Sequence, residues 1–183
     1  METDRTDAGW ATVPNLFTVL RFLLLVPVCW RILDPNPGPL AVVLLVLWAG
    51  TDWVDGWLAR RTNQVSRVGE ILDPIADRLG ISAVVVCLAL QQLVSWWVVA
   101  LILVTDAATV LLAGHAAARG HIHVNWLGKV RTAVLFVALV LLVAASTWLP
   151  QFTNAGRSLL WAGAGMHALA GLGYVLEARG TRS

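Results

Sequence analysis

The sequence predicts an all-helical membrane protein with six transmembrane helices, and its composition, apolar runs and charge placement all support that fold class. Of the 183 residues, 58% are hydrophobic and 13% are charged. A soluble domain carries about 25% charged residues, so this chain has roughly half the charge that a soluble surface needs. Composition therefore excludes a soluble globular protein, a disordered chain and a typical nucleic-acid-binding protein. The length suits a single membrane domain, residues 1–183.

Six apolar runs, each near the length of about 20 residues that crosses a bilayer as a helix, are separated by residues that interrupt helices. Asp34-Pro35-Asn36-Pro37-Gly38 follows the first run, Gln91-Gln92 follows the third, and Leu149-Pro150-Gln151 ends the fifth. We predict spans near residues 16–33, 38–59, 76–93, 95–118, 129–149 and 157–178. The segment before them, residues 1–14, is predicted to lie along the membrane surface.

The basic residues predict the orientation of these spans. With the amino terminus in the cytoplasm, 11 of the 13 lysines and arginines lie on the cytoplasmic side, and Arg31 and Arg157 lie outside. Cytoplasmic loops of membrane proteins are enriched in such residues. We therefore expect a multi-pass protein of the cell membrane, with both termini and the active site in the cytoplasm.

Four of the 11 acidic residues gather at the cytoplasmic ends of the second and third predicted spans; they are Asp52, Asp55, Asp73 and Asp77. The first two are three positions apart and the last two are four apart, so each pair lies on one helix face. The short loop between the spans is expected to bring the two helices side by side. Four carboxylates in one cleft repel one another unless cations lie between them, and hard oxygen ligands favour Mg²⁺, Mn²⁺ or Ca²⁺. We therefore predict a site for two divalent ions, in preference to ion pairs with nearby arginines such as Arg60 and Arg78.

These aspartates belong to a longer pattern, Asp52-x2-Asp55-Gly56-x2-Ala59-Arg60-x8-Gly69-x3-Asp73-x3-Asp77. The pattern resembles the signature of the CDP-alcohol phosphatidyltransferase family, with all eight specified positions filled. The resemblance implies an enzyme that transfers a phosphatidyl group from CDP-diacylglycerol to an alcohol and releases CMP, using two Mg²⁺ or Mn²⁺ ions. It implies that Asp52, Asp55 and Asp73 are metal ligands, that Asp77 is both a ligand and the general base, and that the enzyme is a homodimer.

The resemblance also implies which residues bind CDP-diacylglycerol. Gly56, Arg60 and Ser66 would hold the nucleotide side. The opening Pro14-Asn15-Leu16-Phe17-Thr18-Val19-Leu20-Arg21 resembles the Pro-Asn-x-x-Thr-x-x-Arg start of members that use glycerol-type acceptors. Asn15 and Thr18 would then present polar groups from one helix face toward the cytidine diphosphate, although an N-cap at Asn15 is the simpler alternative.

The acceptor is the open question. Gly128-Lys129-Val130-Arg131-Thr132 resembles a stretch of glycerophosphate-type members, so Lys129 and Arg131 would bind an acceptor phosphate. Asp106 lies well inside a span, which marks it as a functional candidate for the acceptor site or as the partner of a nearby arginine. Thr105-Asp106 differs from the Arg-Glu usual in phosphatidylglycerophosphate synthases and from the Arg-Asp frequent in cardiolipin synthases.

Glycerol 3-phosphate is the leading acceptor, and phosphatidylglycerol, which gives cardiolipin, is the alternative. Two more distant alternatives also use membrane carboxylates. One is a prenyltransferase that binds a diphosphate through Mg²⁺, and the other is a divalent-cation transporter. A nucleic-acid partner is not expected.

Overall fold

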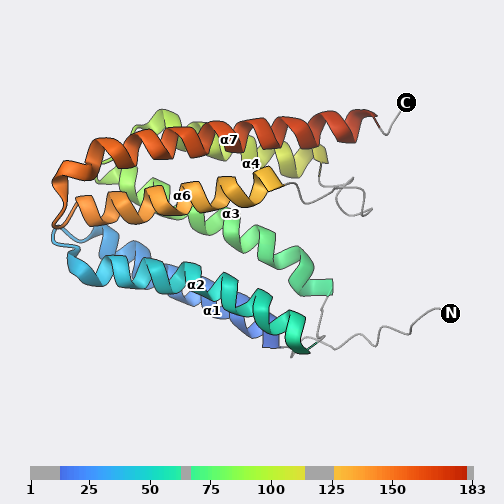
Figure 1. The fold of residues 1–183 in the computed structure, drawn as a ribbon, viewed down its shortest axis with the longest axis horizontal. Coiled ribbons are helices and arrows are strands. Elements are labelled where there is room, and N and C mark those ends of the chain that lie inside the picture. Colours follow the sequence, from blue (N-terminus) through green and yellow to red (C-terminus); the bar gives the residue numbers. More distant parts are fainter. Residues whose placement is uncertain (1–12, 63–66, 114–125, 181–183) are drawn as a thin grey trace.

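A computed structural model shows a bundle of long antiparallel helices (Figure 1). It describes residues 13–62, 67–113 and 126–180, and within these ranges it contains helices and no strand. The prediction of an all-helical fold is therefore confirmed. Among the residues so described, no helix combines the length and the apolar character needed to cross a membrane.

The described part of the chain forms six α-helices. They are α1 (Val13–Leu33), α2 (Gly38–Thr62), α3 (Arg67–Leu90), α4 (Trp96–Ala108), α6 (Trp126–Ala145) and α7 (Thr153–Gly180). A π-helical turn, Thr109–Ala113, continues α4, and a short 3-10 helix, Pro150–Phe152, precedes α7. In Figure 1, α1 begins and α7 ends at the same end of the bundle, as an even number of antiparallel helices requires.

Several helix boundaries differ from the predicted ones. The third helix begins at Arg67 instead of residue 76, and the fifth begins at Trp126 and ends at Ala145 instead of spanning 129–149. Helix α1 already begins at Val13, so the last part of the predicted surface segment, 1–14, is helical, while residues 1–12 lie outside the described part. An apolar run marks only the stretch of a helix that avoids water, and the helix continues into polar residues wherever its end is solvated.

The turn between α1 and α2 confirms the reason for the first break. Arg31 Nη1 donates to Asp34 Oδ2 at 2.6 Å, and Arg31 Nη2 donates to the carbonyls of Asn36 and Pro37 at 3.1 and 2.7 Å. Gly38 has a φ of +63°, which is the left-handed conformation that glycine adopts without strain. One arginine thus satisfies two carbonyl groups of the turn between the helices, which have no partner within a helix.

The helices pack in two groups that share one apolar core. Helices α6 and α7 pack closely along their length, and α1 packs along both α2 and α3. Leu45, Leu88 and Leu139, from α2, α3 and α6, are fully buried in this core. Gly163 of α7 lies against Leu135 of α6 with no room for a side chain, which lets these two helices approach closely.

The indole ring of Trp48 on α2 packs against Gly80 of α3. The described backbones of the two helices have little direct contact, and residues 63–66, which join them, lie outside the described part. A Cβ atom added at Gly80 would lie 2.0 Å from Cζ2 of the buried Trp48 ring. Trp48 is one turn before Asp52, and Gly80 is one turn after Asp77. This contact therefore sets the distance between the two helix turns that carry the aspartates.

We predict that Gly80→Ala destabilises the protein by about 1–3 kcal/mol, the usual cost of overpacking a filled core. The new methyl group would displace a rigid ring and push α2 away from α3, so activity should fall as well. The matched control is Gly165→Ala on α7, where an added Cβ meets nothing within 4 Å. That change should be neutral or stabilising by up to about 1 kcal/mol, because alanine favours helices over glycine. Denaturant or thermal unfolding in detergent measures both, and equal stabilities for the two variants would contradict the prediction.

Candidate active site

The structure places the four aspartates of the motif on two helices. Asp52 and Asp55 belong to α2, and Asp73 and Asp77 belong to α3. Because both segments are helical throughout, spacings of three and four residues put each pair on one face of its helix. The side chains of Asp52, Asp55 and Asp73 are outside the part that the structure describes, whereas the side chain of Asp77 is described.

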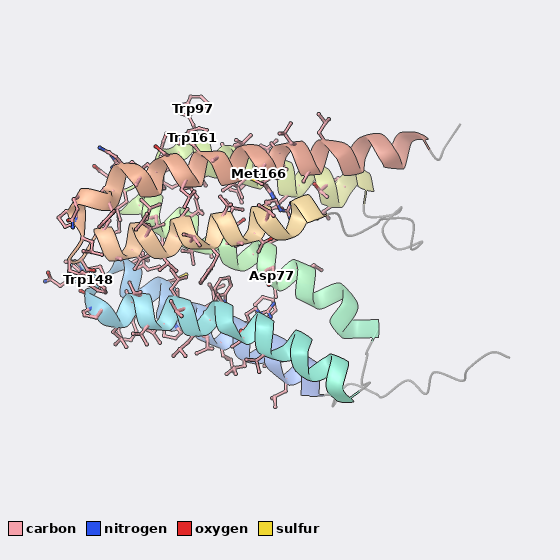
Figure 2. All side chains as sticks on the ribbon, viewed as in Figure 1. Asp77, Trp97, Trp148, Trp161 and Met166 are labelled. Carbon is pink, nitrogen blue, oxygen red and sulfur yellow. The ribbon has the colours of Figure 1, made fainter. Side chains whose placement is uncertain are left out.

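Asp77 forms an ion pair with Arg21 of α1. Arg21 Nη1 donates to Asp77 Oδ1 at 2.5 Å, and the two side chains are 2% and 35% exposed. Figure 2 shows Asp77 on α3, part of the way along the bundle. A guanidinium group is stable at such a buried position only when it is paired and hydrogen-bonded. The Asp77 carboxylate therefore anchors the one fully buried arginine among the described residues.

This ion pair joins the two motifs that the sequence shows separately. Arg21 is the last residue of the Pro-Asn-x-x-Thr-x-x-Arg opening, and Asp77 is the last residue of the aspartate motif. Position 18 is one turn before Arg21 on α1 and so shares its helix face. The face of α1 that carries Thr18 thus lies toward the α3 turn that carries Asp77. The side chains of Asn15 and Thr18 are not described.

The predicted nucleotide residues of the second motif follow the aspartates on α2. Gly56 and Arg60 lie in the last two turns of that helix, since α2 continues to Thr62, past the predicted end at residue 59. Their side chains are not described, and Ser66 lies outside the described residues. The backbone places Gly56 one turn beyond Asp52 and Arg60 one turn beyond Gly56, along one side of the helix.

The donor set of the motif fits hard divalent cations. It offers carboxylate oxygens from adjacent turns of two helices, which is the ligand type that Mg²⁺ and Mn²⁺ select. Asp77 keeps a third of its side chain accessible beside its arginine partner. Among the side chains that the structure describes, no group of three or more His, Cys, Asp or Glu residues gathers elsewhere as a competing metal site.

Asp106 lies at the centre of a second polar cluster, formed by α3, α4 and α7. Arg78 Nη1 donates to Asp106 Oδ1 at 3.1 Å, and His167 Nε2 lies 3.1 Å from the same oxygen. Ser82 Oγ is 3.5 Å from Asp106 Oδ2. Asp106 therefore has the arginine partner that the sequence allowed as an alternative to a substrate role. Arg78 pairs with this aspartate on α4, and the aspartate motif takes its ion pair from Arg21.

Two of these contacts were missed by sequence reasoning. Arg21 was noted only as the end of a motif and as a basic residue of the cytoplasmic side, and His167 was not considered. A signal for Arg21 was present, because an arginine inside an apolar helix needs a carboxylate partner. No comparable signal marked His167, since its partner is distant in the chain and comes from another helix.

The predicted acceptor cations lie near the start of α6. This helix begins at Trp126, so Lys129 and Arg131 occupy its first two turns. The side chain of Arg131 is half-buried, and that of Lys129 is not described. Cations near a helix amino terminus interact unfavourably with the helix dipole, which lowers stability. A bound anion would offset this loss.

Comparisons with known proteins identify the family of this chain. The family model described as CDP-alcohol phosphatidyltransferase matches residues 11–169. A cardiolipin synthase (CMP-forming) of Streptomyces coelicolor is 33% identical over 196 residues, covering 98% of this chain and 86% of the relative. A CDP-diacylglycerol--glycerol-3-phosphate 3-phosphatidyltransferase of Escherichia coli is 32% identical over 183 residues, covering 91% and 94%. This chain belongs to the CDP-alcohol phosphatidyltransferase family.

Family membership defines the class of enzyme. The chain is a CDP-diacylglycerol-dependent phosphatidyltransferase of phospholipid synthesis. The match favours phosphatidyl transfer over the prenyltransferase and cation-transporter alternatives. The matched region includes the whole aspartate motif, Arg21 and both members of the Asp106–His167 contact.

We predict that Arg21→Met lowers the free energy of unfolding by about 1.5–3 kcal/mol, the range for hydrogen bonds to charged groups. The loss stays in this range because Asp77 is one-third exposed and water can solvate its carboxylate once the partner is gone. Activity should fall with stability, since Asp77 loses the contact that orients it. Unfolding in detergent and an assay of CMP release measure the two effects.

The matched control is Arg31→Met, which removes an arginine–aspartate pair at the opposite end of α1. It should leave the turnover number unchanged. A turnover number for Arg21→Met equal to that of the wild type would contradict the orienting role of Arg21.

Proposed function

We propose that this enzyme transfers the phosphatidyl group of CDP-diacylglycerol to a glycerol-type acceptor and releases CMP. The observation that carries the proposal is the complete aspartate motif on α2 and α3, whose last residue is held by Arg21 of α1. Glycerol 3-phosphate is the acceptor we favour, which makes the enzyme a phosphatidylglycerophosphate synthase. The relative from Escherichia coli is named for this reaction and matches along nearly its whole length.

Asp52, Asp55, Asp73 and Asp77 would hold two Mg²⁺ or Mn²⁺ ions. When bound, such ions neutralise the pyrophosphate and stabilise the charge on the leaving oxygen. The chain itself supplies the fixed positions of these ligands, because each pair lies on one face of a continuous helix and Trp48 sets the helix separation.

Asp77 would accept the proton of the acceptor hydroxyl during the transfer. The hydroxyl oxygen forms a bond to the phosphorus that carries diacylglycerol, and the bond from that phosphorus to the bridging oxygen breaks. CMP leaves with the electron pair of the broken bond, and the hydroxyl proton goes to Asp77. A general base must lie within hydrogen-bond reach of the proton it takes, and Arg21 holds Asp77 in one orientation for this purpose.

CDP-diacylglycerol would be bound from α1 and α2. Gly56 lacks a side chain and so admits the nucleotide, while Arg60 and Ser66 bind its phosphates or cytidine. Asn15 and Thr18 would add polar groups from α1. They precede Arg21, whose ion pair with Asp77 joins α1 to α3. The guanidinium group of Arg60 suits phosphate binding because two of its N–H groups can donate to two phosphate oxygens at once.

The acceptor would be bound by Lys129 and Arg131 at the start of α6, with Asp106 as a further polar group of the same region. Phosphatidylglycerol is the second candidate acceptor, and it would make the enzyme a cardiolipin synthase. The relative from Streptomyces coelicolor, which matches over 98% of this chain, carries that name. Both acceptors present a glycerol hydroxyl and a phosphate, so one site of this kind suits either.

We further propose that the bundle resides in the cell membrane as six spans, with both termini and the active site on the cytoplasmic side, and that it forms a homodimer. The low charge of the chain supports this location. So do the many large apolar side chains on the outer surface, among them Val26, Val104 and Leu169, each about two-thirds exposed. Trp97 and Trp148 project near one end of the bundle, where indole rings favour the membrane interface (Figure 2).

We predict that Asp77→Asn abolishes CMP release in a protein that still folds but is less stable, because the buried Arg21 loses its charge partner. The amide has nearly the shape of the carboxylate but cannot accept the proton, and general-base catalysis contributes about 10²–10⁴-fold to a rate. The matched control is Asp34→Asn, the same chemical change in the α1–α2 turn, which should retain full activity. Normal turnover by Asp77→Asn with CDP-diacylglycerol and either acceptor would overturn the assignment of Asp77 as the base.

We predict that purified enzyme given CDP-diacylglycerol and glycerol 3-phosphate forms phosphatidylglycerophosphate, identified by mass spectrometry. In parallel, phosphatidylglycerol is supplied as the sole acceptor and cardiolipin is sought. Arg131→Gln should raise the KM for the anionic acceptor about tenfold or more, since a charge-assisted contact contributes about 1.5–3 kcal/mol. Cardiolipin formation without reaction of glycerol 3-phosphate would replace the favoured acceptor by the second candidate.

A further inference from the structure

A buried polar cluster lies where α3, α4 and α7 meet, and the proposed function gives a role to only one of its members, Asp106. We call it the Asp106 cluster, and its residues are Arg78, Ser82, Asp106 and His167. Asp106 is 14% exposed and provides both carboxylate oxygens to the other three side chains. His167 is one of the members that no step of the transfer uses.

His167 is placed where a polar ring is costly. Its side chain is 5% exposed, and its Nε2 lies 3.1 Å from Asp106 Oδ1. Within the described residues, neither Nδ1 nor Nε2 of His167 has a hydrogen-bond partner, so Nε2 and Asp106 Oδ1 are in close contact without a hydrogen bond. Leaving a buried polar atom unsatisfied lowers stability, and an apolar residue of the same size would avoid that cost. A histidine at this position therefore needs a reason other than stability.

The cluster acts on the same turn of α3 that carries the proposed base. Arg78 directly follows Asp77, and consecutive residues of a helix point about 100° apart. Arg21 of α1 holds Asp77 from one direction, and Asp106 of α4 holds Arg78 from another. These two contacts together determine the rotation of α3 about its axis at the position of Asp77. His167 contacts Asp106 on the oxygen that binds Arg78, so it limits where that carboxylate can lie.

We propose that His167 is a positioning residue for phosphatidyl transfer, acting through Asp106 and Arg78 to orient Asp77. This inference rests on the proposed function, in which Asp77 takes the acceptor proton. His167 does not touch the substrate in this scheme. Its loss lets Asp106 and Arg78 shift, and the α3 turn then loses one of the two contacts that hold Asp77 in place.

The chain offers a matched pair of substitutions at this position. In His167→Gln the side-chain amide nitrogen is as many bonds from the backbone as Nε2, so it can still reach the Asp106 carboxylate. In His167→Asn the amide is one bond shorter and falls short of Asp106, although polarity is kept. We expect His167→Gln to retain most of the wild-type turnover number. We expect His167→Asn to lose about 10- to 100-fold in turnover number, the scale seen when an orienting residue is removed, with the KM for CDP-diacylglycerol unchanged.

A double-mutant cycle tests the route through Asp106. If His167 acts through that carboxylate, His167→Asn should cost nothing further in a protein that already carries Asp106→Asn. Additive losses in the double variant would overturn the inference, as would equal turnover numbers for His167→Gln and His167→Asn.

One control separates positioning from simple loss of folding. Leu160→Ala, two turns earlier on α7 and equally buried, should lower the melting temperature and leave the turnover number of the folded protein unchanged. If Leu160→Ala reduces the turnover number as much as His167→Asn, the effect is structural and the inference fails.

If instead the wild-type protein releases no CMP with either acceptor, the proposed function itself fails. That result differs from an active enzyme that tolerates His167→Asn, which overturns only the inference about His167.

Discussion

The ion pair between Arg21 and Asp77 is the contact on which the rest of the site depends. An arginine inside a bundle of apolar helices is stable only beside a carboxylate, and Arg21 is almost fully buried. The pair therefore determines how α1 lies against α3. It also brings the Pro-Asn opening of the chain to the aspartate motif. The last residues of two motifs more than 50 positions apart in the sequence are thereby joined by an ion pair.

The charged pairs inside the bundle contribute more to specificity than to stability. Removing an ion from water costs several kcal/mol even after relaxation, and the attraction within a pair offsets this only when the geometry is good. Arg21–Asp77 and Arg78–Asp106 are therefore weak sources of net stability. Both nevertheless exclude other rotations of α3, because any rotation would leave a charge unpaired. The apolar core around Leu45, Leu88 and Leu139 supplies the stability, and the ion pairs determine which packing is adopted.

The separation of α2 and α3 matters because carboxylates on two helices can share cations only at one distance. A single large ring against a glycine, Trp48 against Gly80, sets that distance at the turns next to the aspartates. In the proposed function, the acceptor is bound by other residues, Lys129 and Arg131 of α6 and Asp106 of α4. Two relatives of almost equal identity, 33% and 32%, are named for different acceptors. Overall similarity therefore does not distinguish the acceptors.

The sequence by itself determined the helical class, the aspartate motif with its chemistry, and the family to which the chain belongs. These features depend on local properties: apolar run length, spacing within one helix, and the identity of the carboxylate side chains. Helix ends such as Arg67 were misplaced, because hydropathy marks the apolar part of a helix and not its solvated turns. Only the tertiary structure decided that Arg21 pairs with Asp77, that Arg78 pairs with Asp106, and that His167 joins the second pair. Each of these contacts joins two helices, and which faces meet depends on how all the helices pack together.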